Sequence, residues 1–192
     1  AFMTAVHGVA KPTIGILNVG SEDMKGHEEV REAARLLREG GFGLAYHGFV
    51  EGTDIAKGTV DVVVTDGFTG NIALKTAEGV ARFISALMKE ALTSSPMAKA
   101  GALLALPALK RMRQKIDPSA INGGPLLGLN GIVVKSHGGA DAKGFGNAIR
   151  VAVELGRSDY LTRVSESFSR LTAVLEEQPS ASSAGPAMET PQ

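Results

Sequence analysis

The spacing of apolar residues along the chain predicts three successive units, each consisting of a strand, a polar glycine-containing loop and a helix. These units span residues 12–39, 60–92 and 131–156. Their strands are expected over 12–20, 60–65 and 131–136, and their helices over about 27–39, 72–92 and 142–156. In the helix of the first unit, the apolar residues recur at the spacing of one buried face: Val30, Ala33, Ala34 and Leu37. Continuous apolar strands that alternate with helices are typical of a mostly parallel, Rossmann-like sheet with helices on both faces. The predicted fold class is therefore α/β.

Two other segments extend this picture. Residues 42–50 predict a further strand, and a loop is expected over 51–54. Residues 178–192 are rich in Ser, Ala and Pro without an apolar period, which predicts a disordered tail after a folded region over 1–177.

The pattern changes again in the middle of the chain, where we expect a protruding helical hairpin over 93–116. Residues 100–109 form an apolar run without charge, and basic residues follow it directly: Lys110, Arg111, Arg113 and Lys115. Ten apolar residues are too few to span a bilayer, but beside a basic cluster they can lie in the membrane interface. A surface that packs on the core or on a second subunit explains the same pattern equally well.

Composition narrows the classes of partner and site. The 192-residue chain has 20 basic and 20 acidic residues, so no overall charge attracts nucleic acid, and any membrane contact must be local. It has no cysteine, which excludes disulfides within the chain and suits a reducing cytoplasm. Its four histidines have no metal-ligand spacing. We therefore expect a cytoplasmic protein without a metal site and without a nucleic-acid partner.

Candidate chemistry lies in the three polar loops. In open parallel sheets, ligands bind beyond the carboxyl ends of the strands, where loops lead into helix N-termini. Helix N-termini present unpaired N–H groups and a partial positive charge, and glycine allows close approach of the backbone. Three such loops, one of which carries Lys25, favour an anion site over ordinary turns.

The loops also resemble, as a set, the motifs of a known family. They read NVGSEDMKG over 18–26, DVVVTDGFTGN over 61–71 and KSHG over 135–138. This series resembles the PlsX family of bacterial phosphate acyltransferases over about residues 1–170. The resemblance implies a fold like that of phosphate acetyltransferases and isopropylmalate dehydrogenases. It also implies transfer of an acyl group from acyl-acyl carrier protein to inorganic phosphate, no cofactor, and a homodimer attached peripherally to anionic membrane.

The resemblance implies roles for particular residues. Lys25 and Asn71 match the residues regarded as catalytic in the family. The substrate-binding residues are expected to be Asn18, Gly20, Glu22, Asp66, Gly67, Thr69, Gly70, His137 and Gly138. The membrane-contacting residues are expected to be Leu103, Leu104, Leu106, Leu109, Lys110, Arg111 and Arg113.

Alternatives remain for two of these residues. Asn71 can be a helix N-cap, and Asp66 can orient Lys25 or cap a turn. The chemistry itself fits an acyl transfer, because a lysine can pair with phosphate and a side-chain amide can donate to an oxyanion.

The chain also departs from the family pattern. It reads INGGPLLG over 121–128, where Tyr-Gly-Gly-Ala-Pro-Leu-Leu-Gly is common, and has Gly139 where Ser is frequent. A glycine-rich Met-Gly-Gly-Asp start is absent, so we expect a carboxyl-terminal portion of the enzyme. Alternative functions are a non-catalytic fragment that dimerises and contacts membrane, or a coenzyme A-dependent phosphate acetyltransferase relative. A nicotinamide dehydrogenase is disfavoured, because no Gly-x-Gly-x-x-Gly follows a strand with an acid about 20 residues on.

Overall fold

The structure is a computed structural model that describes residues 1–115 and 122–177. Its helices are α1 (Phe2–His7), α2 (Glu28–Glu39), α3 (Gly52–Lys57), α4 (Gly67–Thr93), α5 (Pro96–Lys115), α6 (Ala142–Arg157) and α7 (Tyr160–Glu177). Its strands are β1 (Thr13–Leu17), β2 (Ala45–Val50), β3 (Val62–Val64), β4 (Gly124–Pro125) and β5 (Val134–Lys135). The expected tail over 178–192 lies outside the described residues.

A three-stranded parallel sheet confirms the α/β fold class. Its strand order is β2-β1-β3, with β1 in the centre and parallel to both neighbours. Ile16 of β1, Phe49 of β2 and Ala34 of α2 form a buried cluster, against which Val30 and Leu37 of α2 pack. Three of the four residues of the predicted face of α2 therefore cover the sheet, whereas Ala33 is exposed. Gly15 is required in β1, because a Cβ there would lie 2.7 Å from Val50 Cγ1 on the neighbouring strand.

The third predicted unit does not join this sheet. The expected strand over 131–136 is only two residues long as β5, and it pairs antiparallel with β4 in a separate two-stranded ribbon. Pro125 of β4 has no N–H to donate, which limits how far this ladder can extend. The apolar run correctly indicated an extended segment, but an apolar pattern does not encode which strand is the partner.

Helix boundaries differ from the prediction in three places. The loop expected over 51–54 is largely the start of α3, because Glu51 and Asp54 form a capping box around its first turn. The helix expected from residue 72 begins five residues earlier, at Gly67. The helix α7 was not predicted at all, and it continues the fold to Glu177.

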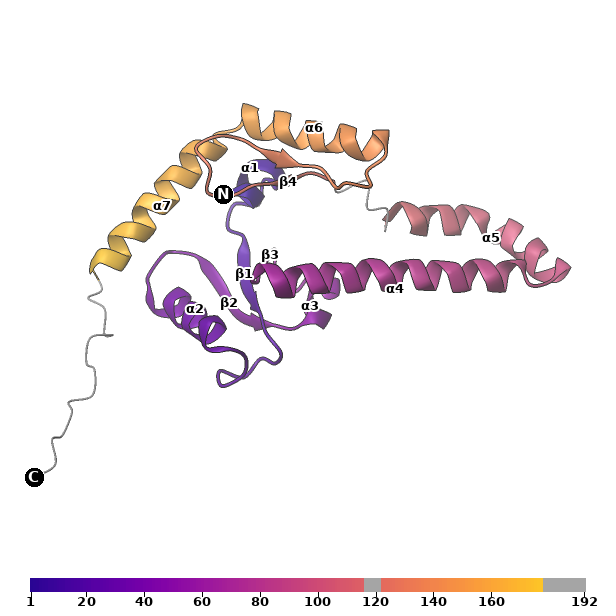
Figure 1. Cartoon of the computed structure of the whole chain (residues 1–192), viewed down its shortest axis with the longest axis horizontal. Helices are drawn as coiled ribbons and strands as arrows, with labels where there is room; N and C mark the ends of the chain where they lie inside the picture. Colours follow the sequence, from indigo (N-terminus) through magenta and orange to yellow (C-terminus); the bar gives the residue numbers. More distant parts are fainter. Residues whose placement is uncertain (116–121, 178–192) are drawn as a thin grey trace, which may run out of the picture.

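The hairpin is longer than expected, because α4 is one of its arms. Residues 96–115 form the single helix α5, which packs against α4 after a turn at Ser94 and Ser95, so a hairpin within 93–116 alone is wrong. Figure 1 shows α4 and α5 projecting together away from the sheet, on the opposite side from α7. No helix among the described residues has the length and apolarity needed to cross a membrane.

Candidate active site

The first and second motifs meet at one edge of the sheet. The strands β1 and β3 are neighbours and run parallel, with Ile14 opposite Val62 and Ile16 opposite Val64. Their carboxyl ends therefore lie side by side, and the loops after Leu17 and Val64 emerge from the same edge. This is the edge at which parallel sheets bind ligands.

Asn18 organises the first loop. Its backbone N–H donates to Val50 O at 2.8 Å, which continues the pairing of β1 with β2 by one residue. Its side-chain Nδ2 donates to Lys25 O at 3.0 Å, and its Oδ1 accepts from Val19 N at 2.9 Å. Asn18 is only 9% exposed, so the loop folds back over it and returns Lys25 to the end of the strand.

Two glycines allow this close packing. Gly26 has φ of +87°, and a Cβ there would run into the side chain of Asn18. At Gly20, a Cβ would lie 2.6 Å from Glu22 Oε2 and 3.2 Å from Lys25 Cγ. The structure thus brings Gly20, Glu22 and Lys25 together around one small space, and their expected roles toward substrate and phosphate stay predictions.

In the second motif, Asp66 is the N-cap of α4. Its Oδ1 accepts from Thr69 N at 2.8 Å, and hydrogen bonding from the side chain and backbone of Thr69 lowers the pKa of Asp66. Of the two roles left open for Asp66, the structure shows capping. Gly70 lies where a Cβ would be 2.8 Å from Thr65 Cγ2, so it lets the helix start close to the strand.

Asn71 is the fifth residue of α4 and its side chain is exposed. The alternative that Asn71 caps the helix is therefore wrong, because Asp66 holds that position. The amide of Asn71 is not needed for capping, which leaves it available to a ligand. At Gly67, in the first turn, an added Cβ would meet nothing within 4 Å, so the approach to this end of the helix is open.

The third motif reaches α4 by a different route, because β5 is not part of the parallel sheet. His137 Nε2 lies 3.8 Å from Glu78 Oε1 of α4. On the other side of the loop, His137 N donates to Asn122 Oδ1 at 2.8 Å. Gly138 is exposed and has open space around its Cα. Among the described residues, no side-chain hydrogen bond or ion pair joins Lys25 to Asn71 or to His137.

Glu78 and Asn122 were not predicted, although each had a signal in the sequence. Glu78 follows Asn71 by seven residues, which is two turns along the same helix face. Asn122 lies in the segment that departs from the family pattern.

The expected membrane residues are displayed on α5. Leu103 is 72% exposed, Leu104 86% and Leu106 43%, whereas Leu109 is half-buried. Lys110 and Arg111 are exposed, and the side chain of Arg113 lies outside the described residues.

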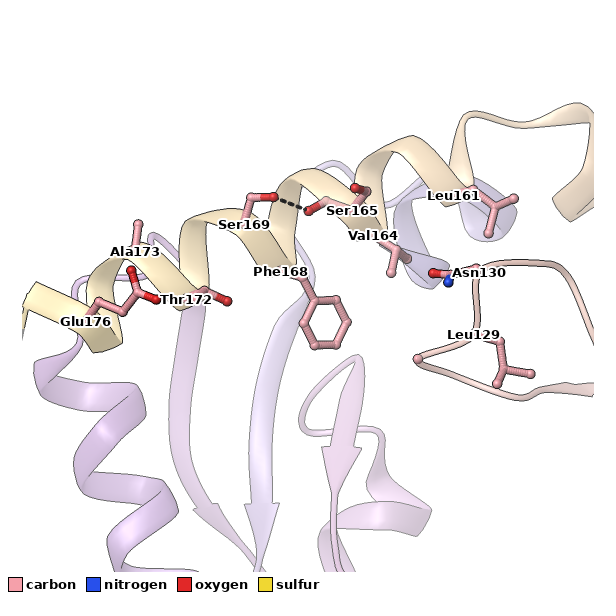
Figure 2. A pocket seen from close by; sticks show the side chains of 11 residues that line it. Leu129, Asn130, Leu161, Val164, Ser165, Phe168, Ser169, Thr172, Ala173 and Glu176 are labelled. Atoms are coloured by element: carbon pink, nitrogen blue, oxygen red, sulfur yellow. Dashed lines mark hydrogen bonds between the residues drawn. The ribbon is translucent and has the colours of Figure 1, made fainter.

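A cavity elsewhere does not coincide with the motifs. It has a volume of about 760 Å³ and lies between α7 and the loop at residues 128–130. Figure 2 shows Phe168 pointing from α7 into this space, with Leu129 and Asn130 on the facing loop. None of the predicted catalytic or substrate-binding residues lines it, so it is not the expected anion site. Within the part of the chain that the structure describes, no group of three His, Asp or Glu side chains could hold a metal ion.

Comparison with known proteins decides the family. The family model described as "Fatty acid synthesis protein" matches residues 1–163, which include all three motifs. The chain belongs to this family. The phosphate acyltransferase of Caulobacter vibrioides is 64% identical over 186 residues, covering 97% of this chain and 52% of that protein.

Other members of the family agree. The phosphate acyltransferase of Phenylobacterium zucineum is 57% identical over 91% of this chain and 49% of its own length. That of Maricaulis maris is 52% identical over 95% of this chain and 52% of its own length. The chain therefore spans about half the length of the curated relatives that it matches.

Proposed function

We propose that this chain carries the catalytic edge of a phosphate acyltransferase, which transfers a fatty acyl group from acyl-acyl carrier protein to inorganic phosphate. The product is an acyl phosphate for phospholipid synthesis. The observation that carries the proposal is the parallel pairing of β1 with β3, which places the Lys25 loop and the start of α4 at one sheet edge. The relatives are named phosphate acyltransferases, which supports the same reaction class.

In this reaction, a phosphate oxygen attacks the thioester carbonyl carbon and forms a carbon–oxygen bond. The carbonyl oxygen becomes an oxyanion, and collapse of this intermediate breaks the carbon–sulfur bond. The carrier leaves as a thiolate, which takes up the proton that the hydrogen phosphate nucleophile loses. Lys25 pairs with the phosphate and reduces the repulsion between this anion and the developing oxyanion. The exposed amide of Asn71 donates to the oxyanion. The N–H groups at the start of α4 add a partial positive charge at the same edge.

The test uses a full-length acyltransferase that contains this chain. We expect Lys25→Ala and Asn71→Ala each to lower kcat/KM by roughly 10²–10³-fold, the effect of losing one preorganised donor. Lys89→Ala is the matched control, because Lys89 is an exposed lysine on α4 remote from the motifs. Full activity of the Lys25→Ala, Asn71→Ala double variant would rule out the assigned roles.

The proposal includes a cytoplasmic homodimer that attaches peripherally to the membrane through α5, the arm of the hairpin that carries the expected membrane residues. The exposed leucines of α5 beside Lys110 and Arg111 support membrane contact. The same surface favours a second candidate, in which this chain alone dimerises and contacts membrane without turnover. Formation of acyl phosphate by the chain alone would exclude that second candidate.

A further inference from the structure

Glu78 is the point at which the third motif touches α4. Its Oε1 lies 3.8 Å from His137 Nε2, while its Oε2 lies 3.1 Å from Lys75 Nζ and 3.6 Å from Arg82 Nη2. We propose that Glu78 is a positioning residue of the acyltransferase, which holds the His137 loop against the face of α4 that begins at Asn71. The effect of Glu78 on catalysis rests on the proposed function. Its effect on the position of the His137 loop rests on the contacts alone.

Helix geometry places this contact on the catalytic face. Asn71, Lys75, Glu78 and Arg82 follow one another at i, i+4, i+7 and i+11, so they form one row along α4. Glu78 lies about 10 Å along the helix axis from Asn71. Because side chains on a helix lean toward its N-terminus, Lys75 and Glu78 extend back toward Asn71. The Glu78–His137 contact thus sets how near the third loop comes to the expected reacting centre.

Both sides of the His137 loop are fixed. Asn122 Nδ2 donates to Ser136 Oγ and to Gly144 O, each at 2.8 Å, while its Oδ1 accepts from His137 N. This amide ties the loop to the start of α6, and Glu78 ties it to α4. Without Glu78, the loop keeps its anchor on α6 and loses its direct tie to α4.

The imidazole is oriented toward Glu78 by its own loop. Gly139 N donates to His137 Nδ1 at 3.1 Å, so Nδ1 acts as the acceptor. The neutral ring therefore carries its proton on Nε2, the atom that faces the Glu78 carboxylate. A carboxylate is a suitable partner for this Nε2–H group, because it can only accept a hydrogen bond. The hydrogen bond from Lys75, with smaller contributions from the charges of Lys75 and Arg82, lowers the pKa of Glu78.

The ion pairs that Glu78 makes with Lys75 and Arg82 on its own helix do not account for its contact with His137, which lies far away in the chain. Lys75 lies three residues before Glu78 and Arg82 four residues after it, and such surface pairs contribute little to stability. The side chain of Glu78 is 32% exposed, against 56% for His137, 58% for Lys75 and 78% for Arg82. The carboxylate is therefore the most sheltered member of the cluster, and it is the one that joins two elements separated by 59 positions in the chain, from 78 to 137.

The test compares Glu78→Gln with Glu90→Gln in a full-length acyltransferase that contains this chain. Gln keeps the size of the side chain and removes its charge, and Glu90 is an exposed control on the same helix. We expect Glu78→Gln to speed hydrogen exchange of the amides at residues 136–139 severalfold. We also expect it to lower kcat about tenfold with little change in KM for phosphate, as loss of an orienting partner does elsewhere. Glu90→Gln changes neither quantity.

A His137→Gln variant and the double variant Glu78→Gln, His137→Gln complete a cycle. If Glu78 acts through His137, the double variant is no slower than His137→Gln alone. Unchanged exchange in Glu78→Gln would overturn the proposal, and so would faster exchange with unchanged kcat. A different result would overturn the proposed function: the wild-type full-length enzyme makes no acyl phosphate, although Glu78→Gln still speeds exchange. The contact would then hold the loop in place but have no catalytic meaning.

Discussion

At the scale of single residues, the first motif is held by hydrogen bonds that it makes with itself. Asn18 uses its side chain to bridge Val19 and Lys25, and it is almost buried. Both its side-chain oxygen and its side-chain nitrogen are hydrogen-bonded within the loop. Its expected contact with substrate stays a prediction. Its described role is to determine where the backbone of Lys25 lies.

Replacement of Gly26 tests this role. Ala at Gly26 meets two penalties, the positive φ of +87° and a collision with the Asn18 side chain, which must then release Lys25 O. Gly41→Ala is the matched control, since Gly41 has φ of +61° but open space around its Cα. We expect backbone strain to cost each variant about 1–2 kcal/mol of unfolding free energy, measured by urea denaturation, and the collision with Asn18 to make the loss larger in Gly26→Ala.

Only Gly26→Ala is expected to lower the acyltransferase activity of the full-length enzyme as well, by at least tenfold, because a 1 Å misplacement can cost about 100-fold. Equal activities of the two variants would show that the position of Lys25 does not depend on the Asn18 bridge.

At the scale of elements, α4 connects the sheet edge to the hairpin. It begins with the Asp66 cap, passes Asn71 and the Glu78 row, and ends at the turn into α5. Its start therefore controls both the candidate site and the direction of the hairpin.

The Asp66 cap predicts a pH dependence of stability. Because hydrogen bonding from Thr69 lowers the pKa of Asp66 in the folded state, its ionised form stabilises the fold above the unfolded value near 3.8. This contribution is lost as pH falls through the folded-state pKa. Asn also caps helices but has no charge to titrate.

We therefore expect the excess stability of the wild type over Asp66→Asn, from thermal unfolding between pH 7 and pH 2, to shrink below about pH 4. Asp66→Ala, which has no cap, should be less stable than Asp66→Asn at every pH. An advantage of the wild type that grows on acidification would contradict the cap.

The same elements show what the sequence could predict. The parallel pairing of the strands and most of the buried face of α2 followed from apolar spacing, although Ala33 of that face is exposed. The early start of α4 was missed because Asp66 was grouped with the loop, although an Asp three residues before Thr69 is a helix-capping pattern. The antiparallel β4–β5 ribbon could not be predicted, because its pairing depends on contacts between elements. The helix α7 had a signal, since Leu161, Val164 and Phe168 recur at helical spacing.

At the scale of the whole molecule, much apolar surface is uncovered. The hairpin displays leucines on α5, and Phe145, Ile149 and Val153 form an exposed row on α6. The chain spans about half the length of its relatives, so surfaces of this kind are expected where a longer fold continues.

The hairpin leucines give a direct test of membrane contact. Leu103→Glu places a charge on α5, and Leu127→Glu places the same charge outside the hairpin at a leucine of nearly equal exposure, 72% against 71%. We expect Leu103→Glu to weaken vesicle binding at least tenfold, because burial of a leucine contributes about 1.5–3 kcal/mol. Flotation with anionic and neutral vesicles measures this, and Leu127→Glu should float like the wild type. An equal loss of vesicle binding in both variants would show that the hairpin is not the specific site of membrane contact.

The strand order of the sheet has a further consequence for assembly. Among the described residues, β2 and β3 each pair on one side only, so the sheet has two open edges. The outer edge of β3 offers three residues to an incoming strand, whereas β2 offers six. An added strand, from the rest of a longer chain or from a second copy, therefore gains the most backbone hydrogen bonds along β2, the edge away from the start of α4.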